Sequence, residues 1–348
     1  MRDMTPATGH PASPNFGEKT GARVGMHRDG WGDGAWSYLY KDDTAYATDR
    51  RERGQIPPMD GVAPGMMKAP VWTWEVPLYF WFGGIASGSA FVAFACDLAG
   101  DDRTARLARA VSLGTVGPCA PLLIMDLGRP ARFLNMLRII KTRSPMSLGA
   151  WALSVFSGVG AAAVGADLIG RRREARALGA VNSLVGGYLG SYTGVLLAST
   201  AVPVWARSRL FLGPIFISTA TATGASTVRL ICRDAPESTR TALGHVQAGA
   251  MAAELILSEI NERRLGGHHA HGAKMKVAKW LVRAGLAAQA TRRTGPVPSL
   301  LYLAAGLLFR YAWVEAGFRS ARDDTSVAEM ARSKRAPTAG GASPASGA

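Results

Sequence analysis

The feature that most constrains the fold is a series of apolar runs, each roughly 20 residues long, that fills the middle of the sequence. A helix of that length spans the hydrocarbon core of a bilayer. A helix also satisfies its own backbone hydrogen bonds where no water is present. The sequence therefore predicts an all-α integral membrane protein whose surroundings are the lipid bilayer.

Composition divides the chain into three regions. Residues 1–70 are polar, residues 71–319 hold the apolar runs, and residues 320–348 are rich in Ala, Ser, Gly and Arg. A polar segment with few apolar residues cannot bury enough surface to offset the entropy of ordering. We predict an N-terminal arm that is disordered or docks a partner, a transmembrane domain, and a disordered C-terminal tail.

The limits of the apolar runs predict seven or eight membrane-spanning helices. They cover approximately residues 76–98, 105–127, 148–169, 177–202, 210–231, 241–262, 272–291 and 297–318. Pro118 and Pro121 predict a kink in the second helix. Residues 272–291 are ambiguous, because Lys276 and Lys279 belong to a one-sided basic stripe. Such a segment either crosses the bilayer or lies in its interface.

Charge and metal-ligand types exclude several function classes. The net charge of +15 lies mostly in short loops beside apolar runs, which favours contact with anionic headgroups over nucleic-acid binding. The three cysteines include no Cys-x-x-Cys pair, so no four-cysteine iron–sulfur cluster is expected. Of the six histidines only His245 lies in an apolar run, whereas a haem between helices needs two axial ligands. We predict no haem, cluster or metal in this chain.

Two sets of polar residues inside the apolar runs are candidates for function. Tyr188 and Tyr192 share one face of the fourth expected helix, which fits either hydrogen bonding between helices or a site for a small polar head group. The ionisable candidates are Asp126, Arg129, His245 and Glu254. Ionisable groups at membrane depth face a partner or water, and they either relay protons or act as structural charges.

Four short motifs, in this order and spacing, resemble the NrfD/PsrC family of membrane subunits from polysulfide-reductase-like complexes. They are residues 126–130 (DLGRP), 144–151 (SPMSLGAW), 192–197 (YTGVLL) and 309–317 (FRYAWVEAG). The resemblance covers approximately residues 72–319. The N-terminal arm lies outside it.

The resemblance implies eight crossings arranged as two four-helix bundles in a bacterial inner or plasma membrane. It implies an exchangeable menaquinone or ubiquinone, a ferredoxin-like iron–sulfur subunit, and a large catalytic oxidoreductase subunit that often contains molybdenum. Tyr192 matches a tyrosine that contacts the quinone head group in relatives, and it would donate a hydrogen bond to a quinone carbonyl. On the first helix this chain offers Ser87 and Ser89 as polar partners.

The function that follows is a quinone-reactive membrane subunit of an oxidoreductase complex, which is not catalytic by itself. Two alternatives stay open. A secondary transporter would place its site between broken helices near the midplane, and the internal prolines and polar fourth helix fit that reading. A purely structural membrane anchor would dock a soluble enzyme without binding quinone.

Overall fold

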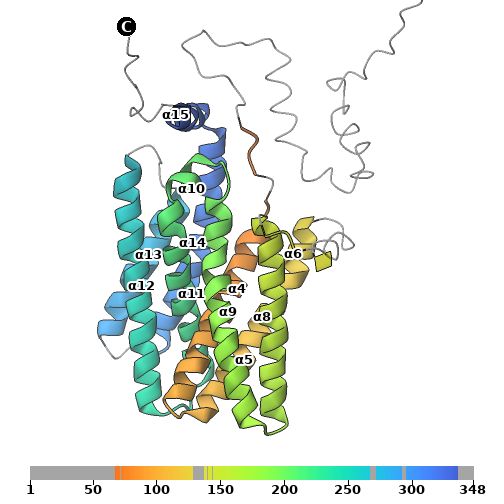
Figure 1. Ribbon diagram of the computed structural model, residues 1–348. Helices are drawn as coiled ribbons and strands as arrows, with labels where there is room; N and C mark the ends of the chain where they lie inside the picture. The colour runs from red at the N-terminus through yellow and green to blue at the C-terminus, as the bar shows by residue number, and fades with distance from the viewer. Residues whose placement is uncertain are drawn as a thin grey trace, which may run out of the picture.

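The computed structural model describes residues 67–70, 72–127, 137–138, 140–142, 144–266, 272–291 and 295–335. Within these residues every regular element is a helix, which confirms the all-α prediction (Figure 1). Residues 1–66 of the predicted arm lie outside the described part. Met67 and Ala69, assigned to that arm from composition, pack against the main apolar core.

Eleven helices lie within the described residues. They are α4 (Glu75–Leu98), α5 (Asp102–Val116), α6 (Cys119–Leu127), α8 (Pro145–Leu168), α9 (Arg172–Ala198), α10 (Pro203–Arg207), α11 (Arg209–Ile231), α12 (Glu237–Leu265), α13 (Ala273–Ala290), α14 (Val297–Arg322) and α15 (Asp324–Arg335).

The second expected helix is interrupted where the sequence predicted only a kink. α5 ends at Val116 and α6 begins at Cys119, with Gly117 and Pro118 forming the break. Proline has no backbone N–H to donate, and glycine is the poorest helix former after proline. Together they end one helix and allow the next to start in a new direction.

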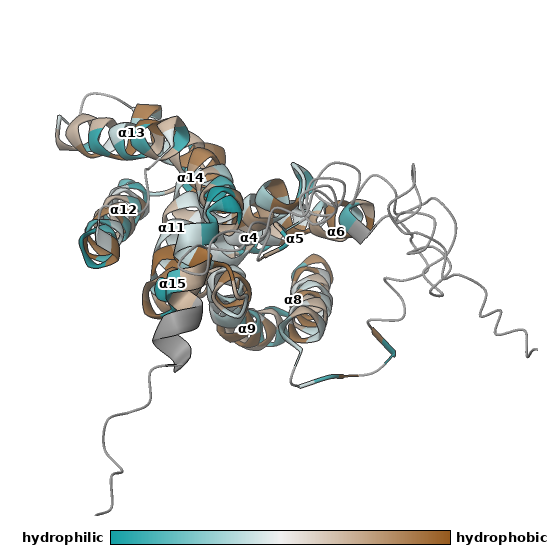
Figure 2. Cartoon of the chain, turned by 90° about the horizontal axis from the view of Figure 1, so that it is seen from above, coloured by the Kyte–Doolittle hydropathy of each residue, from teal (hydrophilic) through white to brown (hydrophobic). Residues whose placement is uncertain are grey.

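Helix α11 lies at the centre of the arrangement. It packs against α4, α9, α12 and α14, and Figure 2 shows it between the α12–α13 side and the α8–α9 side. Its threonine hydroxyls are satisfied inside the helix, since Thr219 donates to Ile215 O at 2.9 Å and Thr223 donates to Thr219 O at 2.9 Å. A helix enclosed by others therefore tolerates this polar content.

Four helical segments of the described chain are long and apolar enough to cross a membrane. They are Glu75–Leu98, Asp102–Asp126, Pro145–Leu168 and Val297–Arg322. The other long helices, α9, α11, α12 and α13, carry more polar residues. Eight crossings in two bundles therefore remain a prediction.

The C-terminal tail contains a helix where the sequence predicted disorder. α14 continues to Arg322, and α15 follows from Asp324 to Arg335. Val327 and Met330 are buried on its inner side, and Glu329 pairs with Arg207 of α10 at 3.3 Å. The low-complexity composition of residues 320–348 as a whole concealed this short amphipathic stretch. Residues 336–348 lie outside the described part.

Asp101 caps α5 in the turn after α4. Its carboxylate accepts the backbone N–H of Thr104 at 3.0 Å and the hydroxyl of Thr239 at 2.7 Å. Partial burial of the carboxylate opposes the effect of these hydrogen bonds, but they lower the pKa of Asp101 below its ordinary value of 3.8.

We expect Asp101→Ala to cost about 1 kcal/mol at neutral pH, because the cap is lost, whereas Asp101→Asn keeps the cap. A lowered folded-state pKa adds stability that is present above the unfolded pKa and is lost as pH falls through the folded pKa. The melting temperature of wild type should therefore fall relative to that of Asp101→Asn as the pH drops below about 4. Parallel pH profiles of the two proteins would contradict this account.

Candidate functional site

Tyr192 lies in the seam between α8 and α9, near the end of the bundle where α8 begins. Its side chain is 2% exposed, and its hydroxyl donates to the carbonyl oxygen of Pro145 in the first turn of α8. The ring rests on Gly149, where an added Cβ would lie 2.2 Å from the ring carbon that carries the hydroxyl. The 144–151 motif thus supplies both the acceptor and the space for this tyrosine.

The local start of α8 explains why Pro145 presents its carbonyl there. Ser144 is the N-cap, and its hydroxyl accepts the backbone N–H of Ser147 at 3.4 Å. Pro145 occupies the first helical turn, where a missing N–H has no cost. The helix start is thereby fixed next to Tyr192.

The two other predicted head-group residues occupy different surroundings. Tyr188 is 42% exposed on the outer side of α9, and its ring packs against Tyr192 with centroids 5.7 Å apart. Ser87 is fully buried on α4, and its hydroxyl donates to Gly83 O of the same helix at 2.8 Å. Ser87 contacts α9 at Gly190. Tyr188 therefore joins Tyr192, whereas Ser87 belongs to the packing between α4 and α9.

Tyr79, which was not among the residues predicted from the sequence, joins the site. The phenol of Tyr79 on α4 lies within electrostatic range of Tyr192 and Cys119, and its side chain is 6% exposed. Tyr79 lies two turns before Ser87 and gave no periodic signal, since the three residues that follow it are also aromatic. The site is thus formed by α4, α6, α8 and α9.

The predicted ionisable residues are spread through the molecule. Asp126 lies at the end of α6, within electrostatic range of Glu75 at the start of α4. Arg129 lies outside the described residues. His245 is exposed on α12, while Glu254 is 1% exposed on the inner face of the same helix and accepts from Ser258 at 2.7 Å. The structure does not bring the three described residues, Asp126, His245 and Glu254, together.

Glu254 belongs to a second buried polar region that includes Arg310 of α14. Arg310 is 1% exposed, and its Nη2 donates to Phe216 O of α11 at 3.2 Å. Its guanidinium carbon lies 4.1 Å from the centroid of the Phe216 ring. Arg310 and Glu254 interact electrostatically through the interior, and the sequence signal for Arg310 was its position inside an apolar run.

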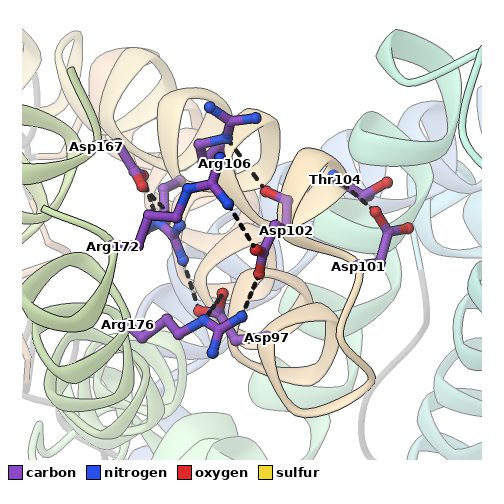
Figure 3. Close-up of polar contacts among 9 residues, drawn as sticks. Asp97, Asp101, Asp102, Thr104, Arg106, Asp167, Arg172 and Arg176 are labelled. Atoms are coloured by element: carbon purple, nitrogen blue, oxygen red, sulfur yellow. Dashed lines mark hydrogen bonds and ion pairs between the residues drawn. The ribbon is translucent and has the colours of Figure 1, made fainter. Parts of the chain in front are cut away.

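An ion-pair network joins α4, α5, α8 and α9 at the end of the bundle opposite Tyr192. It was not predicted from the sequence. Arg109 of α5 bonds Asp97 of α4 at 2.6 Å and Asp167 of α8 through two nitrogens at 2.6 and 3.0 Å. Arg176 of α9 reaches Asp97 and also bonds Asp102 (Figure 3). Charges at three helix ends that fall on one side of the membrane were the signal available in the sequence.

A pocket of about 790 Å³ also lies at that end, between α4, α5, α11 and α12. Its walls are mainly apolar, with Phe91, Leu243 and Val246 among them, and Asp101 and Arg103 lie at its polar side. None of the predicted site residues lines it. The site around Tyr192, Pro145 and Gly149, called here the Tyr192 corner, is therefore separate from this pocket.

Comparison with known proteins gives the family of the chain. No curated protein matches the chain. The family described as polysulphide reductase, NrfD, matches residues 62–257, more than half of the 348 residues. That range contains α4 to α11, and with them Tyr192, Pro145 and Gly149. The apolar helices and this match together show that the chain is an integral membrane protein that belongs to the NrfD family.

Proposed function

We propose that this chain is the subunit that transfers electrons between an iron–sulfur partner and quinone in the bilayer. Electrons pass either from quinol to the partner or from the partner to quinone. A large catalytic subunit would complete the complex. The observation that carries the proposal is the family match, because NrfD proteins are generally quinone-interacting membrane subunits of oxidoreductase complexes and partner with iron–sulfur and catalytic subunits. The quinol form of menaquinone or ubiquinone would supply two electrons and two protons, and the quinone form would accept them in the opposite direction.

The Tyr192 corner suits the hydroxyl of a reduced head group. The single hydroxyl proton of Tyr192 is directed to Pro145 O and the backbone N–H of Gly149 acts on its oxygen, so the remaining lone pair is the acceptor for a further hydrogen bond. It would accept from a quinol O–H without disturbing α8. A quinone carbonyl would require the Tyr192–Pro145 hydrogen bond to break, which alters the donor role expected from the sequence.

Unsatisfied polar atoms on the same helices support a polar ligand in this region. Trp151 Nε1 on α8 and Thr193 Oγ1 on α9 are buried, and neither has a hydrogen-bond partner among the described residues. Buried polar groups are nearly always paired, so such atoms mark places that a bound group would satisfy. Tyr188 beside Tyr192 adds an exposed aromatic surface toward the lipid.

Asp126 is the proposed first proton acceptor. It lies with Glu75 at the same end of the bundle as the start of α8 (Figure 1). A carboxylate at this end of a membrane-spanning segment could take up a proton that a bound quinol releases. His245 and Glu254 lie on α12, so we assign them no role in this step.

We further propose that the chain crosses a bacterial plasma membrane eight times. α4, α5 with α6, α8 and α9 would form one four-helix group, and α11 to α14 the other. Within these groups α4 contacts α5 and α9, α8 contacts α9, α11 contacts α12, and α13 contacts α14, while α11 also packs against α4 and α9 and so joins the two groups. α12 would then be the most polar crossing of the second group.

Mild-detergent purification of the tagged chain from its native membrane tests the proposed function. We expect an iron–sulfur protein with visible absorbance and a large oxidoreductase subunit to co-purify, with quinone in the organic extract. The complex without quinone would favour the structural anchor. A chain that emerges alone, without quinone, would overturn the proposal and favour the transporter.

A further inference from the structure

A basic pocket lies at the end of the bundle opposite Tyr192, where α11 ends and α12 and α14 begin (Figure 1). Its volume is about 330 Å³. Three arginines line it, Arg229, Arg233 and Arg240, together with the first turn of α14 from Gly295 to Ser299. Neither the family match nor the proposed electron transfer assigns this pocket a role.

The positive charges of this basic pocket have no acidic partner. None of the three arginines forms an ion pair with an acidic side chain in the part of the chain that the structure describes. The neighbouring Asp234 pairs instead with Arg103 at 3.6 Å. Arg240 acts on Arg229 as a like charge. Three unneutralised guanidinium groups around one pocket favour an anion between them.

Hydrogen bonds to the start of α14 position Arg229 beside the pocket. Its Nη1 donates to Gly295 O at 3.4 Å and to Ser299 Oγ at 3.3 Å, while its buried Nε has no acceptor. Pro296, the N-cap of α14, supplies no side-chain cap. The positive end of that helix therefore adds to the field of the arginines.

Exposed apolar residues beside the pocket distinguish a lipid from a free ion. Ile231 at the end of α11, and Val297 and Leu300 at the start of α14, are between 43% and 55% exposed. These side chains would lie at the boundary between headgroups and acyl chains if both helices cross the membrane. A basic pocket between helices at this level matches the chemistry of an anionic headgroup with its acyl chains alongside.

We propose that the pocket formed by Arg229, Arg233 and Arg240 binds the phosphate of an anionic phospholipid. Arg229 and the start of α14 hold the phosphate, and the exposed Arg233 and Arg240 close around it. The acyl chains lie along Ile231, Val297 and Leu300. The site stabilises the contact between α11, α12 and α14 and does not depend on quinone binding.

The test compares the thermal stability of the full chain in mixed micelles that contain phosphatidylglycerol or phosphatidylcholine. The test variant is Arg233→Gln with Arg240→Gln. The matched control is Arg171→Gln with Arg173→Gln, which removes the same charge from exposed arginines of the α8–α9 turn at the same end of the bundle. A third arm adds inorganic phosphate at the same concentration to phosphatidylcholine micelles. Equal melting temperatures in phosphatidylcholine show that the variants are folded.

We expect phosphatidylglycerol to raise the melting temperature of wild type and of the control. In the test variant the lipid concentration needed for half of that rise should increase roughly tenfold. Absence of the rise in wild type, or equal loss in the test and control variants, would overturn the site. An equal rise with inorganic phosphate would overturn the lipid as its ligand. These results are independent of quinone content, so failure here leaves the proposed function standing.

Discussion

Gly224→Ala is expected to push α11 away from α4 and to destabilise the protein by about 3 kcal/mol, at the upper end of overpacking effects. A Cβ on Gly224 of α11 would lie 2.2 Å from Gly88 C and 2.4 Å from Ser89 N on α4. These neighbours are backbone atoms, which cannot rotate away as a flexible side chain does. Gly84 and Gly88 are spaced as a small-residue pair of the kind that lets membrane helices approach closely, and the structure makes Gly88 part of this crossing.

The control for this substitution is Gly187→Ala on α9, where a Cβ would meet no heavy atom within 4 Å. Alanine favours a helix over glycine by roughly 0.5–1 kcal/mol, so this variant should be as stable as wild type or more stable. Thermal unfolding and size-exclusion profiles in detergent measure the stability of Gly224→Ala and of Gly187→Ala. Equal stability of Gly224→Ala and wild type would contradict the close approach of α4 and α11.

Arg109→Met is expected to cost about 3–5 kcal/mol, because it leaves the buried Asp167 without its cation and Asp97 with only the more distant Arg176. The side chains of Asp97 and Asp167 are 6% and 9% exposed, so water does not replace the lost partner. Adding Asp97→Asn and Asp167→Asn to Arg109→Met should recover much of the loss, since neutral groups have a lower desolvation cost. The readout is the unfolding transition in detergent.

A surface ion pair in the same region provides the comparison. Arg103 and Asp234 lie 3.6 Å apart, with side chains 65% and 83% exposed. Arg103→Met should therefore cost under about 1 kcal/mol. Similar losses for Arg109→Met and Arg103→Met would show that the buried network contributes no more than the surface pair.

Helix positions could be predicted from the sequence because apolar run length depends only on local composition. The expected helix over residues 148–169 is α8, and residues 272–291 contain α13. The break at Pro118 and the helix α15 could not be placed in this way. α15 depends on packing against other segments, as the pair between Glu329 and Arg207 shows. A proline inside an apolar run is compatible with a kink as well as with the full break seen at Gly117 and Pro118.

The candidate site could be predicted only in part for the same reason. The motifs located Tyr192 and the start of α8, but not the hydrogen bond between them, because it joins residues 47 positions apart. Arg109 and its two aspartates come from three helices whose relative rotation the sequence does not specify. Ser87 satisfied the expectation of a polar residue on α4, yet its hydroxyl is used within its own helix.

Quinol-driven reduction of the iron–sulfur partner in the assembled complex tests the central claim most directly. The comparison is between wild type, Tyr192→Phe and the exposed control Tyr188→Phe, followed by the visible absorbance of the clusters. Phenylalanine keeps the ring on Gly149 and removes only the hydroxyl. Loss of one buried hydrogen-bonding group should slow reduction by about tenfold in Tyr192→Phe, with a small change in Tyr188→Phe. An unchanged rate in Tyr192→Phe would place the quinone site elsewhere.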